Sequence, residues 1–363
     1  MTTPSGDAMS PPDGTTPRFR TFALPSADGT ILTGQVDLPN VPSGTAVIFA
    51  SGSGFFDRDM IYGQTGTPRD KVFKDLGIRL TARGAMAVRA DRRGIAYGIT
   101  GPDAVDSTIT GRITTRKQVE DLRALQDWAL SPGGLGAARV VFLTHSEGTL
   151  HLGRLAASGA PAPARVVAIG ALLESPRSVL RWQAAERDAE SIASLDGNGD
   201  GVTTNDEVRS GLANTPSGVG PLETMLSESG AWDATALDAF RARQRTAYDA
   251  MRTAALAQSD EMPYPDAEPF MGSYEWWKSW FIDDTPNAVN LARWDTDYHF
   301  HIGSIDSQTS PARQEAAARA ALKSGRFRLT VHQGLGHGLS RHPALGPIEE
   351  VVADQIADEA AFA

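Results

Sequence analysis

The sequence predicts an α/β fold in which a mostly parallel central sheet is flanked by helices on both faces. The prediction rests on how strand-like and helix-like segments are arranged along the chain. Short segments rich in Val, Ile and Ala alternate with longer segments of helical periodicity through most of the 363 residues. The alternation stops at 175–293, a long helix-patterned region that we expect to form a largely helical lid inserted between two strands.

The predicted elements begin with a hairpin whose turn lies at Asp28-Gly29. Apolar, β-branched segments predict strands at 46–50, 86–90, 139–143, 165–170, 299–302 and 327–331. Helical periodicity predicts helices near 69–82, 116–130, 149–157, 312–323 and 348–360. The core is therefore expected to comprise residues 18–174 and 294–363. Residues 1–17, rich in Thr, Pro, Ser and Gly, are expected to form a disordered leader.

Composition excludes several classes of function. The formal net charge of −10 argues against a nucleic-acid partner, which normally needs a basic face. No apolar run approaches the ~20 residues that a membrane-spanning helix requires. Because the sequence contains no cysteine, it has neither disulfides nor thiolate metal sites. Composition therefore agrees with a soluble enzyme, either cytoplasmic or, if a signal peptide has been removed, secreted. The expected partner, a small-molecule ester, follows only from the motifs below. Composition indicates no particular oligomeric state.

Residues 144–148, Thr-His-Ser-Glu-Gly, directly follow the strand predicted at 139–143. A strand that enters a small-x-Ser-x-Gly turn is typical of a nucleophile elbow, in which the serine has strained dihedrals and its hydroxyl projects from the sheet edge. Gly148 is the small residue that lets strand and helix pass closely, whereas Thr144 departs from the commoner glycine. Ser146 is therefore the predicted nucleophile. The alternative is a serine that only caps a helix.

An acyl-transfer serine needs a histidine to accept its proton. Among the C-terminal histidines His332, His337 and His342, we favour His337, because glycines bracket it in a loop just after the strand at 327–331. The alternative is a solvated loop histidine.

The histidine in turn needs an acid that precedes it in the chain. Asp306 follows the strand at 299–302, and one helix and one strand separate it from His337, a spacing that brings two neighbouring strand ends together. Glu174, which follows the strand at 165–170, is the rival acid.

The strand at 46–50 enters a glycine-rich turn, Ser51-Gly52-Ser53-Gly54. Tetrahedral intermediates require backbone N–H donors where negative charge develops. The predicted donors are the N–H of Ser53 and the N–H of Glu147, the residue after the nucleophile. A plain tight turn is the alternative. A phosphate loop is disfavoured, because the sequence lacks the Gly-x-x-x-x-Gly-Lys pattern there.

These motifs resemble those of the α/β-hydrolase superfamily of serine hydrolases, most closely its bacterial esterase-like members. Those members carry Gly-Ser-Gly followed by Asp-Arg-Asp, then an Asp-x-Arg-Gly turn, then a His-Ser-x-Gly elbow. The corresponding residues here are 52–54, 57–59, 91–94 and 145–148. The resemblance covers 18–173 and 297–363, and it implies the fold, the triad and hydrolase chemistry. It implies no substrate, because this fold hosts many reactions.

Aromatic side chains gather near the end of the lid. Trp277 and Trp280 share a helical face at i, i+3 spacing, and Trp276 lies beside them. With Phe55, next to the glycine-rich turn, they are predicted to line the substrate pocket. The alternative is that the tryptophans seat the lid on the core.

The lid also contains residues 196–207, which fit the EF-hand calcium loop at every required position. Calcium prefers oxygen ligands, here the side chains of Asp196, Asn198, Asp200 and Glu207 and the carbonyl of Val202. A helix leading in over 177–195 is expected. The sequence contains no second such loop, so this one is expected to stand alone and to act as a structural staple. The alternative is an acidic, glycine-rich turn.

Three functional classes follow. The first is a serine hydrolase of carboxylic esters that works through an acyl-enzyme. The second is an aminopeptidase or amidase on the same triad, which would need an acidic anchor for a substrate ammonium. Candidate anchors are Glu147, Glu174, Asp283 and Asp284. The third is a non-catalytic calcium-binding protein on a hydrolase scaffold.

Overall fold

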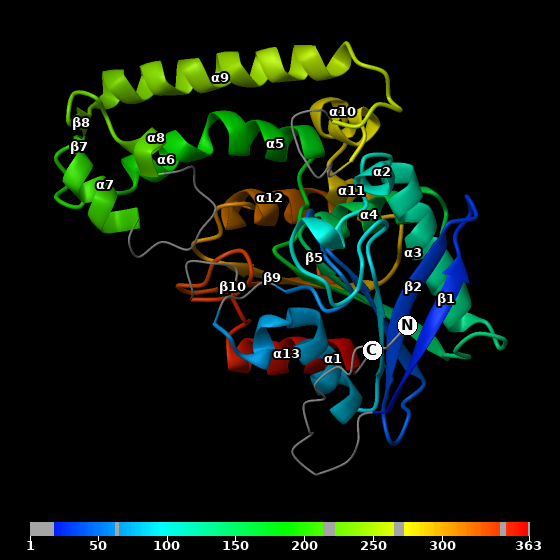
Figure 1. The fold of residues 1–363 in the computed structure, drawn as a ribbon. Helices are drawn as coiled ribbons and strands as arrows, with labels where there is room; N and C mark the ends of the chain where they lie inside the picture. Colours follow the sequence, from blue (N-terminus) through cyan, green and yellow to red (C-terminus); the bar gives the residue numbers. More distant parts are fainter. Residues whose placement is uncertain (1–17, 62–64, 213–221, 265–271, 342–345, 362–363) are drawn as a thin grey trace.

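The computed structural model describes residues 18–61, 65–212, 222–264, 272–341 and 346–361, so the predicted leader at 1–17 lies outside the described residues. At its centre is an eight-stranded sheet in the order β1-β2-β4-β3-β5-β6-β9-β10 (Figure 1). From β4 to β10 all neighbours pair in parallel, whereas β2 is antiparallel to both β1 and β4. The predicted mostly parallel sheet is confirmed.

Every predicted strand is present, with ends that differ by two residues at most. The strands are β1 (Arg18–Pro25), β2 (Ile31–Leu38), β3 (Thr45–Ala50), β4 (Met86–Ala90), β5 (Arg139–His145), β6 (Arg165–Ile169), β9 (Asp297–Gly303) and β10 (Phe327–His332). The hairpin turn between β1 and β2 contains Gly29 at φ 82°, which explains why a glycine stands there.

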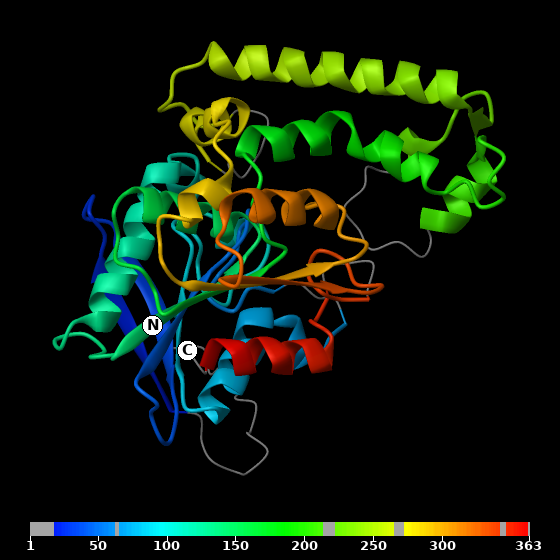
Figure 2. The ribbon, with the colours of Figure 1, turned by 180° about the vertical axis from the view of Figure 1, so that it is seen from behind.

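The helices of the core are α1 (Val72–Ala82), α2 (Ser107–Thr110), α3 (Thr115–Leu130), α4 (Glu147–Ala157), α12 (Pro311–Ala321) and α13 (Glu350–Ala361). Two short 3₁₀ turns, Pro68–Asp70 and Pro102–Ala104, lie between them. The helix predicted from 69 therefore begins only at Val72, because a proline-initiated turn precedes it. Helices α1 and α13 cover one face of the sheet, and α3, α4 and α12 cover the other (Figures 1 and 2).

Alternation along the central strands divides the core into two layers. Ile48 and Phe142 point toward the face covered by α3 and α4, whereas Val47 and Leu143 point toward the face covered by α1 and α13. Because both faces are covered, these strands are apolar throughout and show no polar alternation. The burial of both layers explains why the strands were predictable from apolar runs alone.

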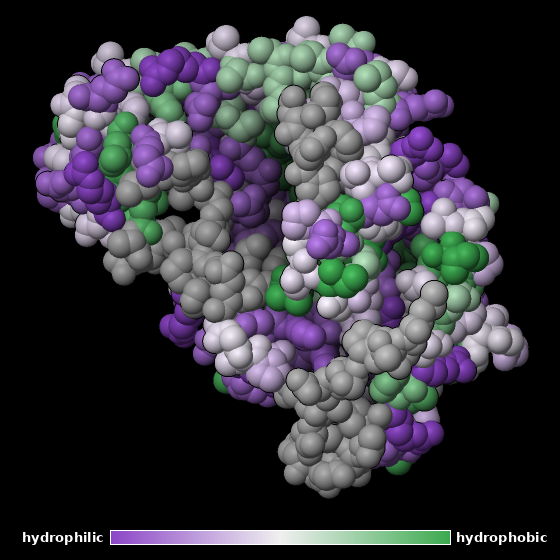
Figure 3. All heavy atoms as spheres, viewed as in Figure 1, coloured by the Kyte–Doolittle hydropathy of each residue, from purple (hydrophilic) through white to green (hydrophobic). Residues whose placement is uncertain are grey.

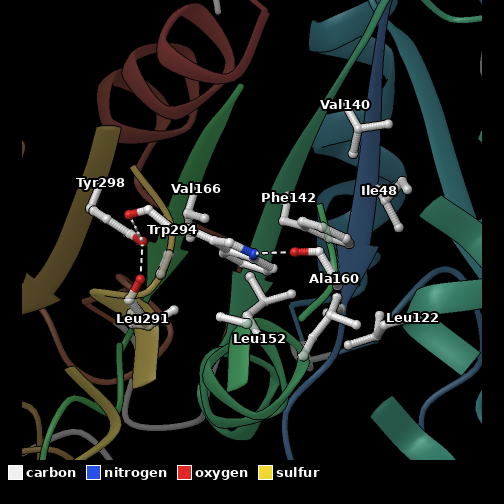
Figure 4. Packing of buried hydrophobic residues seen from close by; sticks show 14 of the residues in the cluster. Ile48, Leu122, Val140, Phe142, Leu152, Ala160, Val166, Leu291, Trp294 and Tyr298 are labelled. Carbon is white, nitrogen blue, oxygen red and sulfur yellow. Dashed lines mark hydrogen bonds between the residues drawn. The ribbon is translucent and has the colours of Figure 1, made fainter. Parts of the chain in front are cut away.

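Aromatic residues close the first layer where the insertion returns to the sheet (Figure 4). Trp294 is nearly parallel to Phe142, with ring centroids 6.4 Å apart, and its indole N–H donates to the carbonyl of Ala160 at 2.8 Å. The buried hydroxyl of Tyr298 donates to the carbonyl of Leu291 at 2.5 Å. The polar atoms of both side chains are therefore satisfied inside an apolar layer.

We call the segment between β6 and β9 the insertion. It contains α5 (Pro176–Ala185), α6 (Arg187–Ala193), β7 (Thr203–Thr204), α7 (Asn205–Leu212), α8 (Leu222–Met225), β8 (Ala231–Trp232), α9 (Ala234–Leu256), α10 (Tyr274–Ile282) and α11 (Asn287–Leu291). The single helix predicted over 177–195 is wrong: it breaks at Glu186, whose backbone (φ −123°, ψ −41°) leaves the helical region. The long helix α9 lies over α5 (Figure 1), and α11 packs against α4 of the core. A largely hydrophilic hollow lies beside the insertion (Figure 3).

Among the described residues, no helix is long and apolar enough to cross a membrane.

Gly303, the last residue of β9, sets how closely two loops approach each other. A Cβ placed there would lie 2.0 Å from the carbonyl oxygen of Leu335 and 2.4 Å from that of Gly336. Because both contacts are with backbone, Gly303→Ala should lower the free energy of unfolding by on the order of 1–3 kcal/mol, measured by chemical denaturation.

Gly133→Ala is the matched control, since nothing lies within 4 Å of a Cβ there. We expect this control to change the stability by less than about 0.5 kcal/mol. Equal stability of the two variants would contradict the steric argument.

Candidate active site

Ser146 lies in the sharp turn between β5 and α4. Its backbone dihedrals are φ 51° and ψ −120°, a region that costs a non-glycine residue about 1–3 kcal/mol. The turn is possible because α4 passes very close to β3: a Cβ on Gly148 would lie 2.3 Å from the carbonyl oxygen of Ala50. Thr144 fits in place of the commoner glycine, because its hydroxyl shares a buried 2.9 Å hydrogen bond with Thr149.

Asp306 and His337 lie together on the loops that follow β9 and β10. Nδ1 of His337 is 2.9 Å and 3.1 Å from the two carboxylate oxygens of Asp306. The carboxylate also accepts the backbone N–H groups of Gln308 and Thr309, each at 2.8 Å. Both residues are buried, so the acid is held from several sides and fixes the imidazole.

The loop of His337 reaches the Ser146 turn through contacts with Gly170 and His145. The imidazole packs on Gly170, at the end of β6, where a Cβ would lie 2.6 Å from the ring. It also meets the ring of His145 edge-on, at a centroid distance of 4.8 Å. Burial is the main cause that lowers the pKa of His145 well below its usual value, and the nearby His337 lowers it further. His145 therefore stays neutral beside His337. The structure therefore brings the residue before Ser146 into contact with His337.

The rival residues are engaged elsewhere. Glu174 accepts hydrogen bonds from the Arg313 guanidinium at 2.7 Å and 3.0 Å and from Ser178 at 2.9 Å, and it joins the insertion to α12. His332 contacts His301, with 3.0 Å between their ring nitrogens, and burial and His301 lower its pKa to about 4. His342 lies outside the described residues.

The glycine-rich turn after β3 lies against the Ser146 turn. A Cβ on Gly52 would be 2.9 Å from Cβ of Ser146, so only glycine permits this approach. Glu147 is the first residue of α4, where a backbone N–H has no partner within the helix. Ser53 and Glu147, the predicted oxyanion donors, are joined directly: the Ser53 hydroxyl donates to the Glu147 carboxylate at 2.9 Å.

Sequence reasoning considered the side chain of Glu147 only as an anchor for a substrate ammonium and missed its role in joining the segments of the site. Its fully buried carboxylate accepts hydrogen bonds from Ser53, from Nη2 of Arg92 at 3.3 Å and from Nε1 of Trp276 in α10. Arg92 also donates to the carbonyl of Gly52. One carboxylate thus joins the glycine-rich turn, the turn after β4 and the insertion. Arg92 stands at the variable position of the Asp-x-Arg-Gly motif, so the motif gave no signal for this contact.

Electrostatics keep this carboxylate ionised. Burial alone would raise the pKa of Glu147, but the charges of His151 and Arg92 and the Ser53 hydrogen bond hold it well below its usual range. Burial also lowers the pKa of His151, although Glu147 opposes this. Because an arginine keeps its charge at any ordinary pH, Arg92 is the partner that balances Glu147.

The two charged sequence motifs also bind each other. The backbone N–H and Nε of Arg58 both donate to Asp91, each at 3.0 Å. Arg89 is bonded to Asp37 at 2.8 Å and also to Asp59. These buried ion pairs hold the turns after β3 and β4 in place beneath the site.

Comparisons with known proteins add information on the fold. Neither the protein-family models nor the curated proteins contain a match to this sequence. Among solved structures, a hyperthermophilic esterase from the archaeon Pyrobaculum calidifontis is 14% identical with a TM-score of 0.51, over 95% of this chain and 85% of that one. DcsB, solved with a substrate analogue, is 16% identical with a TM-score of 0.51, over 95% and 100%. An esterase from Pyrococcus furiosus is 11% identical with a TM-score of 0.50, over 95% and 90%.

The chain has the α/β-hydrolase fold. At these identities the comparison establishes the fold, so the roles of individual residues depend on the geometry above.

Within this α/β-hydrolase fold, the predicted pocket residues differ in exposure. Trp276 and Trp280 are 3% and 7% exposed and pack with Leu150 of α4, as the packing interpretation expects. Trp277 is only partly buried and contacts Tyr264 at a ring-centroid distance of 4.6 Å. Phe55 is 37% exposed, beside the glycine-rich turn.

The acidic loop at 196–207 is closed by hydrogen bonds to its own backbone. Asp196 accepts the N–H groups of Gly199 and Gly201, each at 2.8 Å. Glu207 accepts the N–H of Gly197 at 3.1 Å and that of Thr204 at 2.8 Å. Nowhere in the described part of the chain are three His, Asp or Glu side chains gathered so that they could hold a metal ion.

The expectation that this loop stands alone is wrong. Its strand β7 pairs antiparallel with β8, which leads into α9 as β7 leads into α7. The two helix–strand–helix units share an apolar core that contains Ile192, Val208 and Trp232. The second unit lacks the ligand pattern, so sequence matching missed it.

The pair of Glu147 and Arg92 gives a stability prediction. Glu147→Gln would leave the buried Arg92 cation without its counter-charge, and we expect the free energy of unfolding to fall by roughly 3–5 kcal/mol. Glu315→Gln, which breaks a surface pair with Arg319, should cost less than about 1 kcal/mol. Urea denaturation of both variants measures the difference, and equally small losses would contradict a buried charge pair.

Proposed function

We propose that this protein is a serine hydrolase of carboxylic esters, with Ser146 as nucleophile, His337 as general base and Asp306 as the residue that orients His337. One observation carries the proposal: a strained serine turn adjoins a buried pair of histidine and aspartate at the carboxyl ends of parallel strands. Binding sites in open α/β sheets lie at this edge.

The proposed reaction starts with attack of Ser146 Oγ on the ester carbonyl carbon. Nε2 of His337 takes the serine proton as the bond forms, and Asp306 stabilises the imidazolium through Nδ1–H. Collapse of the tetrahedral intermediate breaks the carbon–oxygen ester bond, and His337 returns the proton to the departing alcohol. Water then attacks the acyl-enzyme by the same route and releases the carboxylic acid and free Ser146.

The intermediate carries its negative charge on the former carbonyl oxygen. We assign its stabilisation to the backbone N–H groups of Glu147 and Ser53. Donors that are fixed before reaction need no reorganisation, and each one is typically worth ~10²–10³ in rate. The bond between the Ser53 hydroxyl and the Glu147 carboxylate supports this assignment, because it ties the two donor segments together.

The acidic residues favour an ester over a peptide substrate. An aminopeptidase needs a free carboxylate for the substrate ammonium. Each sequence candidate has an arginine partner: Glu147 has Arg92, Glu174 has Arg313, Asp283 has Arg154 at 3.3 Å and Asp284 has Arg177 at 3.3 Å. The strained backbone at Ser146 argues against a purely structural role, because a structural role does not require such strain.

We propose that the acyl group contacts Phe55 and Trp277. Their exposure supports this, because a side chain must present surface to a ligand. Trp276 and Trp280 support this pocket by packing α10 against α4, and Trp276 also donates a hydrogen bond to Glu147.

The triad proposal predicts that Ser146→Ala abolishes both ester turnover and covalent labelling by a fluorophosphonate. Asp306→Asn should lower kcat by about 10⁴, because the imidazole loses its oriented tautomer. Nitrophenyl-ester assays measure both. Glu174→Gln serves as control and should retain the wild-type rate. Labelling that persists in Ser146→Ala, or a large loss in Glu174→Gln, would overturn the assignment.

We further propose that the loop at 196–207 binds one structural Ca²⁺, held by Asp196, Asn198, Asp200 and Glu207 and by the carbonyl of Val202. The donor set fits the chemistry of the ion, since all five donors are oxygens. A carboxylate oxygen has two lone pairs, so Asp196 and Glu207 can keep their backbone bonds and also coordinate an ion. Bound calcium would supply positive charge that holds the loop carboxylates together and stiffens the joint of α6 and α7.

Calcium should therefore raise the melting temperature and EDTA should lower it. Binding to the folded state alone stabilises by about 2.7 kcal/mol at a hundredfold excess over Kd. Glu207→Gln should remove the calcium dependence, while Asp206→Asn, a 93% exposed neighbour outside the ligand set, should keep it. Thermal melts with and without calcium give the result. No shift at millimolar calcium would mean that the loop is only an acidic turn.

A further inference from the structure

A cavity of about 340 Å³ lies between α5 and α9, away from Ser146 and its partners. Four arginines line it: Arg177 and Arg181 from α5, Arg252 from α9 and Arg313 from α12. The cavity therefore lies where the insertion meets the core. Its volume is at the lower end of the range for small-molecule sites.

Three carboxylates also line this cavity, and two of them are already bonded. Glu186 receives both ends of the Arg245 guanidinium at 2.7 Å, and Asp284 receives Arg177 at 3.3 Å. The third, Asp249, is exposed on α9. The cations thus outnumber the anions in the lining.

Two arginines in the cavity have weak or no partners. The contact of Arg181 with Glu186 is 3.9 Å, too long for a hydrogen bond. Arg252 forms no ion pair with any described residue, and its buried Nε has no hydrogen-bond partner within the described segments. A buried guanidinium N–H without an acceptor is costly, so this position favours a ligand that supplies one.

The hydroxyl of Tyr248 is a second buried donor without a partner among the residues described. Tyr248 is 4% exposed and lines the same cavity, one turn before Arg252 on α9. Burial raises the pKa of this hydroxyl, and the positive charges of Arg177, Arg252 and Arg181 oppose the rise. The hydroxyl is thus protonated at neutral pH and lies in a positive potential.

We propose that this cavity binds a small oxyanion, a carboxylate or a phosphate group, held by Arg252 and Arg181 with a hydrogen bond from the Tyr248 hydroxyl. Guanidinium groups match the geometry of such anions and bond them in pairs. A neutral donor beside two cations fits the same ligand.

The test titrates the full-length protein with inorganic phosphate and, separately, with succinate, with sodium chloride holding the ionic strength constant. Calorimetry and thermal melts should show saturable binding of one of these anions per chain. Tyr248→Phe, which removes only the unpartnered hydroxyl, should weaken binding about fivefold. Arg252→Gln should weaken it at least tenfold. Arg243→Gln, an exposed arginine of α9 outside the cavity, should bind as the wild type does.

Preference for phosphate or for succinate identifies the ligand class, and either result supports the site. Failure of both anions to bind saturably would overturn the proposal, as would wild-type binding by Arg252→Gln. A melting shift retained in full by Tyr248→Phe and Arg252→Gln would be a general salt effect and would also overturn it. The readout does not involve ester cleavage, so the outcome is independent of the proposed hydrolase activity.

Discussion

The arrangement of the candidate active site depends on one buried ion pair, that of Glu147 and Arg92. Arg92 comes from the turn after β4 and binds both the Glu147 carboxylate and the carbonyl of Gly52. The pair therefore fixes the glycine-rich turn against the helix that begins at the nucleophile. A buried charge that loses its partner is strongly destabilising, so partly assembled states of this site are disfavoured. The Asp57–Asp59 and Asp91–Gly94 motifs surround this pair with further buried charges that are also matched.

The insertion is part of this arrangement and not an appendage to it. Trp276 donates to Glu147, and its neighbour Glu275 accepts the backbone N–H of Thr115 at 3.0 Å and the Thr115 hydroxyl at 2.9 Å. A carboxylate there satisfies a free donor at the start of α3 and opposes the helix dipole favourably. On the other side, Gln183 donates to the carbonyl of Gln308, two residues from Asp306, at 2.7 Å. The helices α5 and α10 therefore contact both the elbow and the acid loop, which couples the shape of the insertion to the site.

The part of the insertion around β7 and β8 is stabilised by a core of its own. Around β7 and β8 two helix–strand–helix units share a small apolar core of their own, separate from the layers on the sheet. Only the first unit carries the acidic ligand pattern. Its carboxylates are satisfied by the loop's own N–H groups, so the loop holds its turn through hydrogen bonds while keeping oxygen lone pairs for an ion. Both units therefore contribute to the shared apolar core, whereas only the first has residues suited to bind a metal ion.

Sequence by itself determined the features that depend on near neighbours in the chain. Strand and helix positions follow from apolar periodicity, and Gly148 marks the turn at Ser146 because only glycine fits against the Ala50 carbonyl. The choice of Asp306 and His337 followed from element order, since parallel neighbouring strands bring their ends together. Tertiary structure alone decided the role of the Glu147 side chain, whose partners Arg92, Ser53 and Trp276 lie 55, 94 and 129 residues away. It also decided the break at Glu186 and the pairing of β7 with β8. Local sequence patterns reflect the conformational preferences of the backbone, which depend on near neighbours. The free energy of burying a charge depends instead on partners that only folding brings within bonding distance.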